Sequence, residues 1–145
     1  MSEALVIDAH QHFWDPARKD YGWLTADLPT LFKPFQPDDL QPILTTHQID
    51  ATVLVQAAPT TAETEYLLAL ADHTPFVKGV VGWIDFENPN ERTTLERLAK
   101  HPLLKGIRPM VQDIADPDWL VKAEIDWAFD ALQQFDLAFD ALVLP

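Results

Sequence analysis

The chain has 145 residues, of which 48% are hydrophobic, and this is enough for one domain with a buried core. Lys and Arg number 10 against 23 Asp and Glu, so the formal net charge of −13 makes nucleic acid and anionic membrane surfaces poor partners. No apolar run approaches the roughly 20 residues of a membrane-spanning helix, and there is no cysteine for a disulfide. The acidic start at residues 1–3 lacks the features of a secretory signal. We therefore expect a single domain over residues 1–145, located in the cytoplasm.

The first predicted strand begins in the apolar run of residues 4–7 and leads into the sequence Asp-Ala-His-Gln-His at residues 8–12. Because side chains alternate faces along a strand, His10 and His12 share a face with Asp8. Two imidazoles on one face can supply two ligands of a zinc-like metal site. We predict that His10 and His12 are catalytic and metal-binding residues, with Asp8 as a hydrogen-bonding neighbour that orients them. The alternative is a pair of histidines held by loop hydrogen bonds.

The rest of the chain alternates between helix and strand patterns. A long loop over residues 15–37 comes first, and loops of this length in compact domains are usually functional. A helix opens at Pro37, and it is followed by predicted strands at 51–56, 76–84, 105–112 and 137–144, with helices at 61–73, 90–101 and 117–135. Each later unit has roughly 30 residues, the size of one parallel strand with its return helix. This alternation predicts an α/β fold with a parallel sheet buried on both faces.

Polar residues gather where the predicted strands end. Besides the histidine pair, these residues are Gln56, Asp85, Arg108 and Gln112. The carboxyl ends of the strands are where a (β/α)8 barrel keeps its active site, and no glycine-rich nucleotide motif points to another kind of site. A complete barrel needs about 250 residues, so the chain is expected to supply only part of one.

Five blocks of sequence carry a resemblance to a known family. They lie at residues 7–16, 53–68, 80–85, 105–113 and 139–143, and the first block reads Ile-Asp-Ala-His-Gln-His-Phe-Trp-Asp-Pro. Their order resembles the amidohydrolase superfamily, in the amidohydrolase-2 branch that contains sugar lactonases and pyrone-dicarboxylate lactonases. The resemblance implies a TIM-barrel, (β/α)8, metallo-hydrolase-type fold, of which this chain is the amino-terminal part with about the first five strands.

The resemblance also implies a chemistry, which is the opening of a sugar lactone to its aldonic acid by a hydrolase of carbohydrate metabolism. It implies that His10 and His12 hold one divalent metal ion or polarise the lactone carbonyl without metal, while Arg108 binds a substrate oxygen. Arg108 stands where binuclear relatives carry a bridging lysine, so a two-metal site is not expected. In this family a later histidine and a final aspartate complete the site, and this chain contains neither position.

Several strand-end residues are predicted to contact the small-molecule substrate. A guanidinium at the end of a buried strand requires an acidic partner or a ligand oxygen, so Arg108 is predicted to be catalytic, with an internal ion pair as the alternative. Gln56 and Gln112 are predicted substrate contacts or amides that tie down loops. The predicted pocket wall consists of Trp14 and Trp83, with Trp23 as a further candidate and a core role as the alternative for Trp83.

Two other functions stay open at this point. One is a metal-dependent decarboxylase of aromatic acids from the same superfamily. The other is a non-catalytic half-barrel that only binds or assembles. Because five strands of a barrel leave two edges and an apolar face open, the isolated chain is expected to be oligomeric or weakly stable, with little or no lactonase activity.

Overall fold

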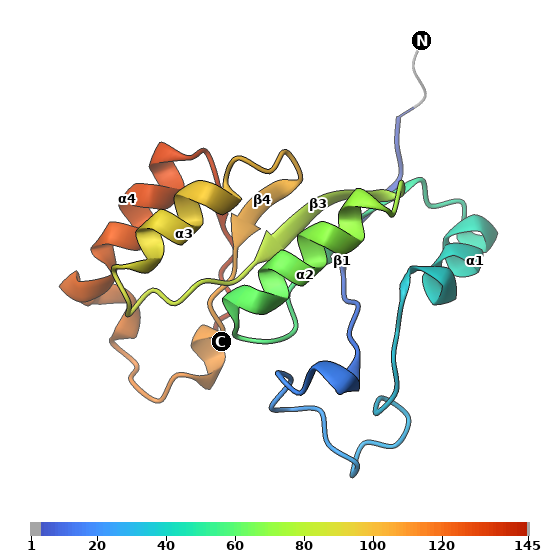
Figure 1. The fold of residues 1–145 in the computed structure, drawn as a ribbon, viewed down its shortest axis with the longest axis horizontal. Helices are drawn as coiled ribbons and strands as arrows, with labels where there is room; N and C mark the ends of the chain where they lie inside the picture. The colour runs from blue at the N-terminus through green and yellow to red at the C-terminus, as the bar shows by residue number, and fades with distance from the viewer. Residues whose placement is uncertain (1–3, 145) are drawn as a thin grey trace.

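Five parallel strands form one curled sheet in a computed structural model that describes residues 4–144 (Figure 1). Residues 1–3 and 145 lie outside the described part, and with them the acidic start from which the location was inferred. The strands are β1 (Ile7–Gln11), β2 (Ala51–Val55), β3 (Val77–Gly82), β4 (Leu104–Ile107) and β5 (Ala138–Phe139). Each strand pairs in parallel with the next one along the chain. This is the strand order of the first part of a (β/α)8 barrel, as predicted.

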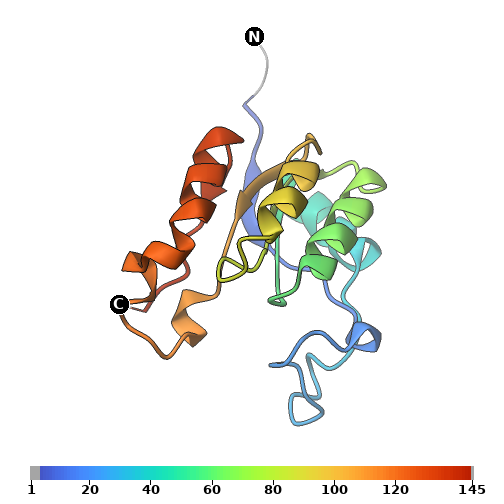
Figure 2. The ribbon, with the colours of Figure 1, turned by 60° about the vertical axis from the view of Figure 1, so that its left-hand side comes forward.

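Helices return the chain between successive strands. They are α1 (Pro37–His47), α2 (Thr61–Asp72), α3 (Glu91–Leu98) and α4 (Asp126–Gln134). Figures 1 and 2 show α2 and α3 side by side on one face of the sheet, with α4 next to α3. The main core lies between these helices and the strands and includes the fully buried side chains of Leu54, Leu67, Val80, Leu95 and Ile107. No helix within residues 4–144 has both the length and the apolar character needed to cross a membrane.

The first, fourth and fifth strands differ most from their predicted bounds, and β3 is shorter than predicted at both ends. The first strand starts at Ile7 rather than at residue 4, and Ile7 is 46% exposed because β1 has a neighbour on one side only. The fourth ends at Ile107, since Pro109 lacks a donor and the chain then turns into the short 3₁₀ helix η2 (Val111–Asp113). The fifth is only Ala138–Phe139, because its one partner in the described sheet is the short β4.

The long helix predicted over residues 117–135 is also divided. Two 3₁₀ turns, η3 (Trp119–Val121) and η4 (Ala123–Ile125), precede α4. Lys122 separates the turns in an extended conformation, with φ −76° and ψ 132°. Trp119 turns into the core and stacks on Phe86, with ring centroids 5.9 Å apart. The chain therefore forms two 3₁₀ turns that bury this indole, where a regular helix was predicted to begin.

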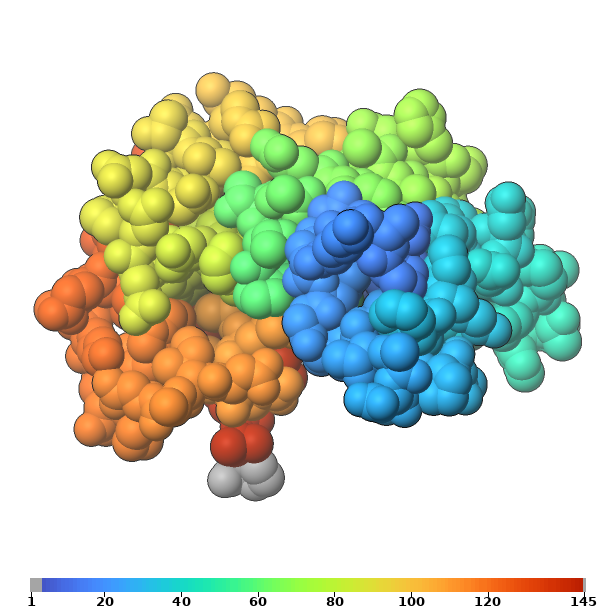
Figure 3. All heavy atoms as spheres, turned by 60° about the horizontal axis from the view of Figure 1, so that its bottom comes forward, coloured from blue at the N-terminus to red at the C-terminus, as the bar shows by residue number. Residues whose placement is uncertain are grey.

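The loop between β1 and α1 is ordered by its own small core. Tyr21 and Leu24 are buried there against Ala57 and Ala58, which follow β2. In Figure 3 this loop, in blue, lies beside the segment around residues 110–125, in orange. Both segments follow the carboxyl ends of strands, so they flank the edge of the sheet where the polar residues were predicted to gather.

Candidate active site at the carboxyl ends of the strands

The two histidines of strand β1 converge as predicted. Their Nε2 atoms lie 3.1 Å apart, and the rings meet edge to face with centroids 4.8 Å apart. His10 is the penultimate residue of β1 and His12 follows the strand directly, so the extended backbone brings both rings to the same side. Two ring nitrogens thus face one point in space.

The hydrogen bond of His12 determines which of its nitrogens is free. Nδ1 lies 2.8 Å from the carbonyl oxygen of Val55, and a carbonyl only accepts, so Nδ1 carries the proton. Burial lowers the pKa of His12, and the positive charge of Arg108 lowers this pKa further, against the opposing effect of the Val55 hydrogen bond. The ring is therefore neutral near pH 7, and its Nε2 lone pair points to His10.

Asp8 does not orient the imidazoles in the way the sequence suggested. Its carboxylate accepts a hydrogen bond from the backbone N–H of His10, at 3.0 Å, rather than from either ring. The carbonyl of Val55 holds the His12 ring instead, and it belongs to the neighbouring strand β2. A backbone acceptor on another strand leaves no trace in the side-chain pattern of β1.

Arg108 follows strand β4 and brings a buried positive charge to the histidines. It is only 4% exposed, and its Nη1 lies 3.3 Å from Nε2 of His10. Its Nη2 donates to the carbonyl and the side-chain oxygen of Gln56, while Nε has no partner among the described residues. Burial lowers the pKa of Arg108, opposed by the carboxylates of Asp140 and Glu63.

No carboxylate within residues 4–144 forms an ion pair with Arg108. A buried guanidinium that is held only by neutral groups is costly unless a ligand supplies the missing negative charge. Its planar fork suits a carboxylate or a developing oxyanion. The internal ion pair that was the alternative for Arg108 is therefore not seen.

A cavity of about 470 Å³ opens beside these groups. Four predicted site residues line it, namely His12, Trp14, Arg108 and Gln112. Trp23 also lines it and meets Trp14 edge to face at 5.4 Å, which gives the cavity an aromatic wall. The remaining lining residues, none of them predicted, are Ala57, Met110, Asp113 and Leu142.

Two predicted contacts do not reach this cavity. Gln56 is fully buried under Arg108, where its amide donates to the Arg108 carbonyl at 3.2 Å, so it supports the arginine. Trp83 instead lines a second cavity of about 220 Å³ together with Asp85 and Trp119. The hydroxyl of Thr64 bonds both the N–H and the carbonyl of Trp83, at 2.7 Å each, and so fixes the backbone from which this ring projects.

The comparison with known proteins identifies the family. Residues 7–144 match the family model described as amidohydrolase. The chain belongs to the amidohydrolase family. Within this family it is 45% identical over 139 residues to an L-fucono-1,5-lactonase from Burkholderia ambifaria and 38% identical over 147 residues to one from Burkholderia multivorans. These matches cover 96% and 97% of this chain.

A solved amidohydrolase shares the architecture as well. The crystal structure of an amidohydrolase from Burkholderia multivorans with bound zinc is 35% identical and aligns with a TM-score of 0.86. The match covers 97% of this chain and 50% of that one. The chain spans about half the length of the curated relatives it matches, 48% and 47%. The fold expected from the resemblance, the first part of an amidohydrolase barrel, is confirmed.

The histidine pair of this amidohydrolase chain fits two corners of a metal site. Tetrahedral zinc with nitrogen ligands at 2.0–2.1 Å places those nitrogens about 3.3 Å apart, close to the 3.1 Å between the two Nε2 atoms. Within residues 4–144, no group of three or more His, Cys, Asp or Glu side chains is arranged to hold a metal ion. The described residues therefore supply two of the ligands that such an ion needs.

Glu63 is a residue of the site region that the sequence reasoning missed. It is fully buried in the first turn of α2, and its carboxylate accepts hydrogen bonds from the backbone of Ala57, a cavity residue. A signal for it existed, because Glu63 precedes the buried Leu67 by four positions and Ala71 by eight, and so lies on the apolar face of the helix. A carboxylate on that face requires polar partners inside the fold.

Proposed function

We propose that this amidohydrolase chain supplies the histidine pair and the oxygen-binding arginine of a sugar lactonase, whose substrate is L-fucono-1,5-lactone or a close relative. The observation that carries this proposal is the convergence of His10, His12 and Arg108, of which His12 and Arg108 line one cavity and His10 contacts both of them. The two relatives named L-fucono-1,5-lactonase support the substrate class. The decarboxylase alternative has no comparable support.

The reaction adds water to the lactone carbonyl and breaks the ring C–O bond. The ring oxygen takes a proton and becomes a hydroxyl group, and the carbonyl carbon becomes the carboxylate of the aldonate with release of the other proton. Negative charge develops on the carbonyl oxygen first and remains on the product carboxylate. Arg108, buried without a counter-ion, binds that oxygen throughout.

The histidines would hold one divalent metal ion through their facing Nε2 atoms. When bound, such an ion supplies Lewis-acid polarisation of the carbonyl and an activated water. The chain's own contribution is the unprotonated Nε2 of His12, which the Val55 carbonyl secures by keeping the proton on Nδ1. The same lone pair can take a proton from water in a metal-free reaction.

The aromatic wall suits the sugar part of the substrate. Trp14 and Trp23 face the same cavity as Arg108, so a lactone ring can pack its C–H face on an indole while its carbonyl reaches the guanidinium. We infer a neutral sugar lactone as the small-molecule partner. The net charge of −13 argues against nucleic acid, and the cytoplasmic location stays a prediction.

The test measures ring opening of L-fucono-1,5-lactone by NMR. The 145-residue chain is assayed alone and co-expressed with the carboxyl-terminal half of the Burkholderia ambifaria lactonase, the part of that relative that this chain does not match. We expect a rate near the spontaneous one for the chain alone. The co-purified pair is expected to turn over the lactone, and His12→Ala should lower its rate at least about 100-fold.

Two results would contradict the proposal. One is a co-purified, folded pair that leaves the lactone at its spontaneous rate. The other is hydrolysis that persists unchanged in both His12→Ala and Arg108→Ala. His47→Ala serves as the matched control, since His47 ends helix α1 and lies outside the cavity.

A further inference from the structure

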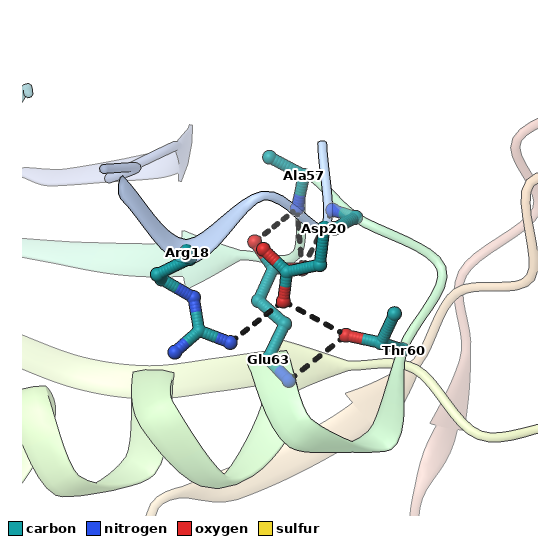
Figure 4. Close-up of polar contacts among 6 residues, drawn as sticks. Arg18, Asp20, Ala57, Thr60 and Glu63 are labelled. Atoms are coloured by element: carbon teal, nitrogen blue, oxygen red, sulfur yellow. Dashed lines mark hydrogen bonds and ion pairs between the residues drawn. The ribbon is translucent and has the colours of Figure 1, made fainter. Parts of the chain in front are cut away.

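The buried carboxylate of Glu63 captures the backbone directly after strand β2. Its Oε2 accepts the N–H of Ala57 at 3.0 Å and the N–H of Ala58 at 2.6 Å (Figure 4). Glu63 is fully buried, so this pair of hydrogen bonds is shielded from water. Hydrogen bonds to a carboxylate are stronger than those between neutral groups. The Ala57 peptide is therefore firmly held on its N–H side.

The peptide group between Ala57 and Ala58 connects this carboxylate to the long loop. The carbonyl of Ala57 accepts the indole N–H of Trp23 at 2.7 Å. Ala57 and Trp23 both line the cavity that contains His12 and Arg108. Trp23 is 39% exposed and lies in the long loop, where its ring also contacts Trp14 and Tyr21 edge to face. A short chain of hydrogen bonds thus runs from Glu63 through Ala57 to the cavity wall.

The same turn of helix α2 anchors this loop a second time. Asp20 accepts a hydrogen bond from the hydroxyl of Thr60, the N-cap of α2, at 3.2 Å, and pairs with Arg18 at 2.7 Å. The Thr60 hydroxyl in turn accepts the N–H of Glu63 at 3.1 Å. The guanidinium of Arg18 lies 4.3 Å from the ring centre of Tyr66, also on α2. Figure 4 shows the hydrogen bonds that link Arg18, Asp20, Thr60 and Glu63.

We infer that Glu63 is a positioning residue that, through the Ala57 peptide, fixes Trp23 as the outer wall of the active-site cavity. The Trp23 ring lines the cavity and lies edge to face with Trp14 at an interplanar angle of 83°, so its placement shapes that wall of the cavity. A Trp23 ring that is fixed in this way restricts the size of the substrate ring that can enter and the face that it presents. This consequence for substrate choice rests on the proposed lactone hydrolysis, whereas the placement of Trp23 does not.

The first experiment follows the indole N–H of Trp23 in the 145-residue chain by ¹⁵N NMR. Its hydrogen-exchange rate is compared with that of the Leu54 amide, which reports the stability of the buried strand β2. In Glu63→Gln, a single neutral amide oxygen replaces the carboxylate that both backbone N–H groups share, which weakens these hydrogen bonds, so we expect Trp23 to exchange about tenfold faster relative to Leu54. Glu65→Gln makes the same change on the exposed side of α2 and should leave the ratio unaltered.

A second variant reads the same connection in the other direction and keeps the inference testable if Glu63→Gln does not fold. Trp23→Phe removes the indole donor and keeps an aromatic ring in this exposed loop residue, and we expect the Ala57 amide to exchange several-fold faster. Trp14→Phe is the control, because the Trp14 indole donates to Leu31 and not to Ala57.

The outcomes separate cleanly. An unchanged exchange ratio in folded Glu63→Gln, or an unchanged Ala57 amide in Trp23→Phe, overturns the inference. A loss of protection at Leu54 equal to that at Trp23 also overturns it, since Glu63 would then only stabilise the fold. None of these measurements uses a substrate, so a negative lactonase assay leaves their interpretation intact.

Discussion

Two buried ionisable side chains, Arg108 and Glu63, have different surroundings. The guanidinium of Arg108 is held by the neutral groups of Gln56 and faces the cavity. The carboxylate of Glu63 instead accepts the backbone N–H groups of Ala57 and Ala58. Arg108 is thus available to a ligand, while Glu63 serves the protein. Sequence alone ranks both as strand-end or helix-start charges and does not separate these roles.

Glu63 makes the stability of the fold depend on pH. Burial raises its pKa to about 7, although its hydrogen bonds from Ala58 and Ala57 oppose the rise. A group whose folded pKa lies above its unfolded value stabilises the protein below the unfolded pKa, and that contribution is lost as the pH rises through the folded pKa. The free energy of unfolding should therefore fall between pH 4.5 and about 7, by an amount of the order of 3 kcal/mol from this residue.

Urea unfolding at several pH values measures this effect. The difference in unfolding free energy between the unaltered chain and Glu63→Gln cancels the histidines that titrate in the same window. The unfolding free energy of the unaltered chain, relative to that of Glu63→Gln, should fall as the pH rises. A difference that is flat from pH 4.5 to 8 would show that the Glu63 carboxyl keeps an ordinary pKa.

Strand β3 and helix α2 pack tightly together at Gly82. A Cβ built there would lie 2.8 Å from the hydroxyl oxygen of Thr64 and 3.1 Å from its Cβ. Thr64 is fully buried, and its hydroxyl bonds both backbone groups of Trp83, so it has no room to move. Because Gly82 has no side chain, α2 can pack closely against the sheet at Thr64.

Gly82→Ala should destabilise the fold by about 1–3 kcal/mol, because the methyl group overpacks this contact. Gly79→Ala is the matched control in the same strand, since its nearest neighbour is the flexible Lys105 side chain at 3.0 Å. We expect Gly79→Ala to change stability by less than about 1 kcal/mol. Thermal melts followed by circular dichroism give both values, and equal losses would contradict the packing argument.

The sheet as a whole is open on both sides. Within the described residues, β1 and β5 each have a neighbouring strand on one side only. Apolar side chains are exposed beside the β1 edge, among them Leu5, Val6 and Ile43. Open strand edges together with exposed apolar surface favour association with other chains. The single domain over residues 1–145 and the homo-oligomer both stay predictions of the sequence.

Light scattering on the purified 145-residue chain tests the assembly state. We expect dimers or larger species whose fraction grows with protein concentration, or a broad melt with low cooperativity. Charged substitutions at the edge, such as Val6→Lys, should reduce association, whereas Val121→Lys on an exposed turn away from β1 should not. A monodisperse monomer that melts cooperatively would show that half of a barrel is stable alone.

Local patterns were sufficient for the order of the elements and for the histidine pair. Apolar periodicity and turn residues act over a few positions, so helices α1 to α3 and the convergence of His10 with His12 follow from neighbouring residues. The family resemblance then supplied the barrel. The bounds of the first, fourth and fifth strands did not follow, because a strand is as long as its partner allows.

The roles inside the site depended on contacts between segments far apart in the chain. The Val55 carbonyl sets the His12 tautomer, and the Gln56 amide supports Arg108. Val55 and Gln56 both lie at the end of β2, whereas His12 follows β1 and Arg108 follows β4. Glu63 reaches the cavity wall only through the Ala57 peptide. These contacts join backbone groups, which every residue carries, so residue type alone does not predict them.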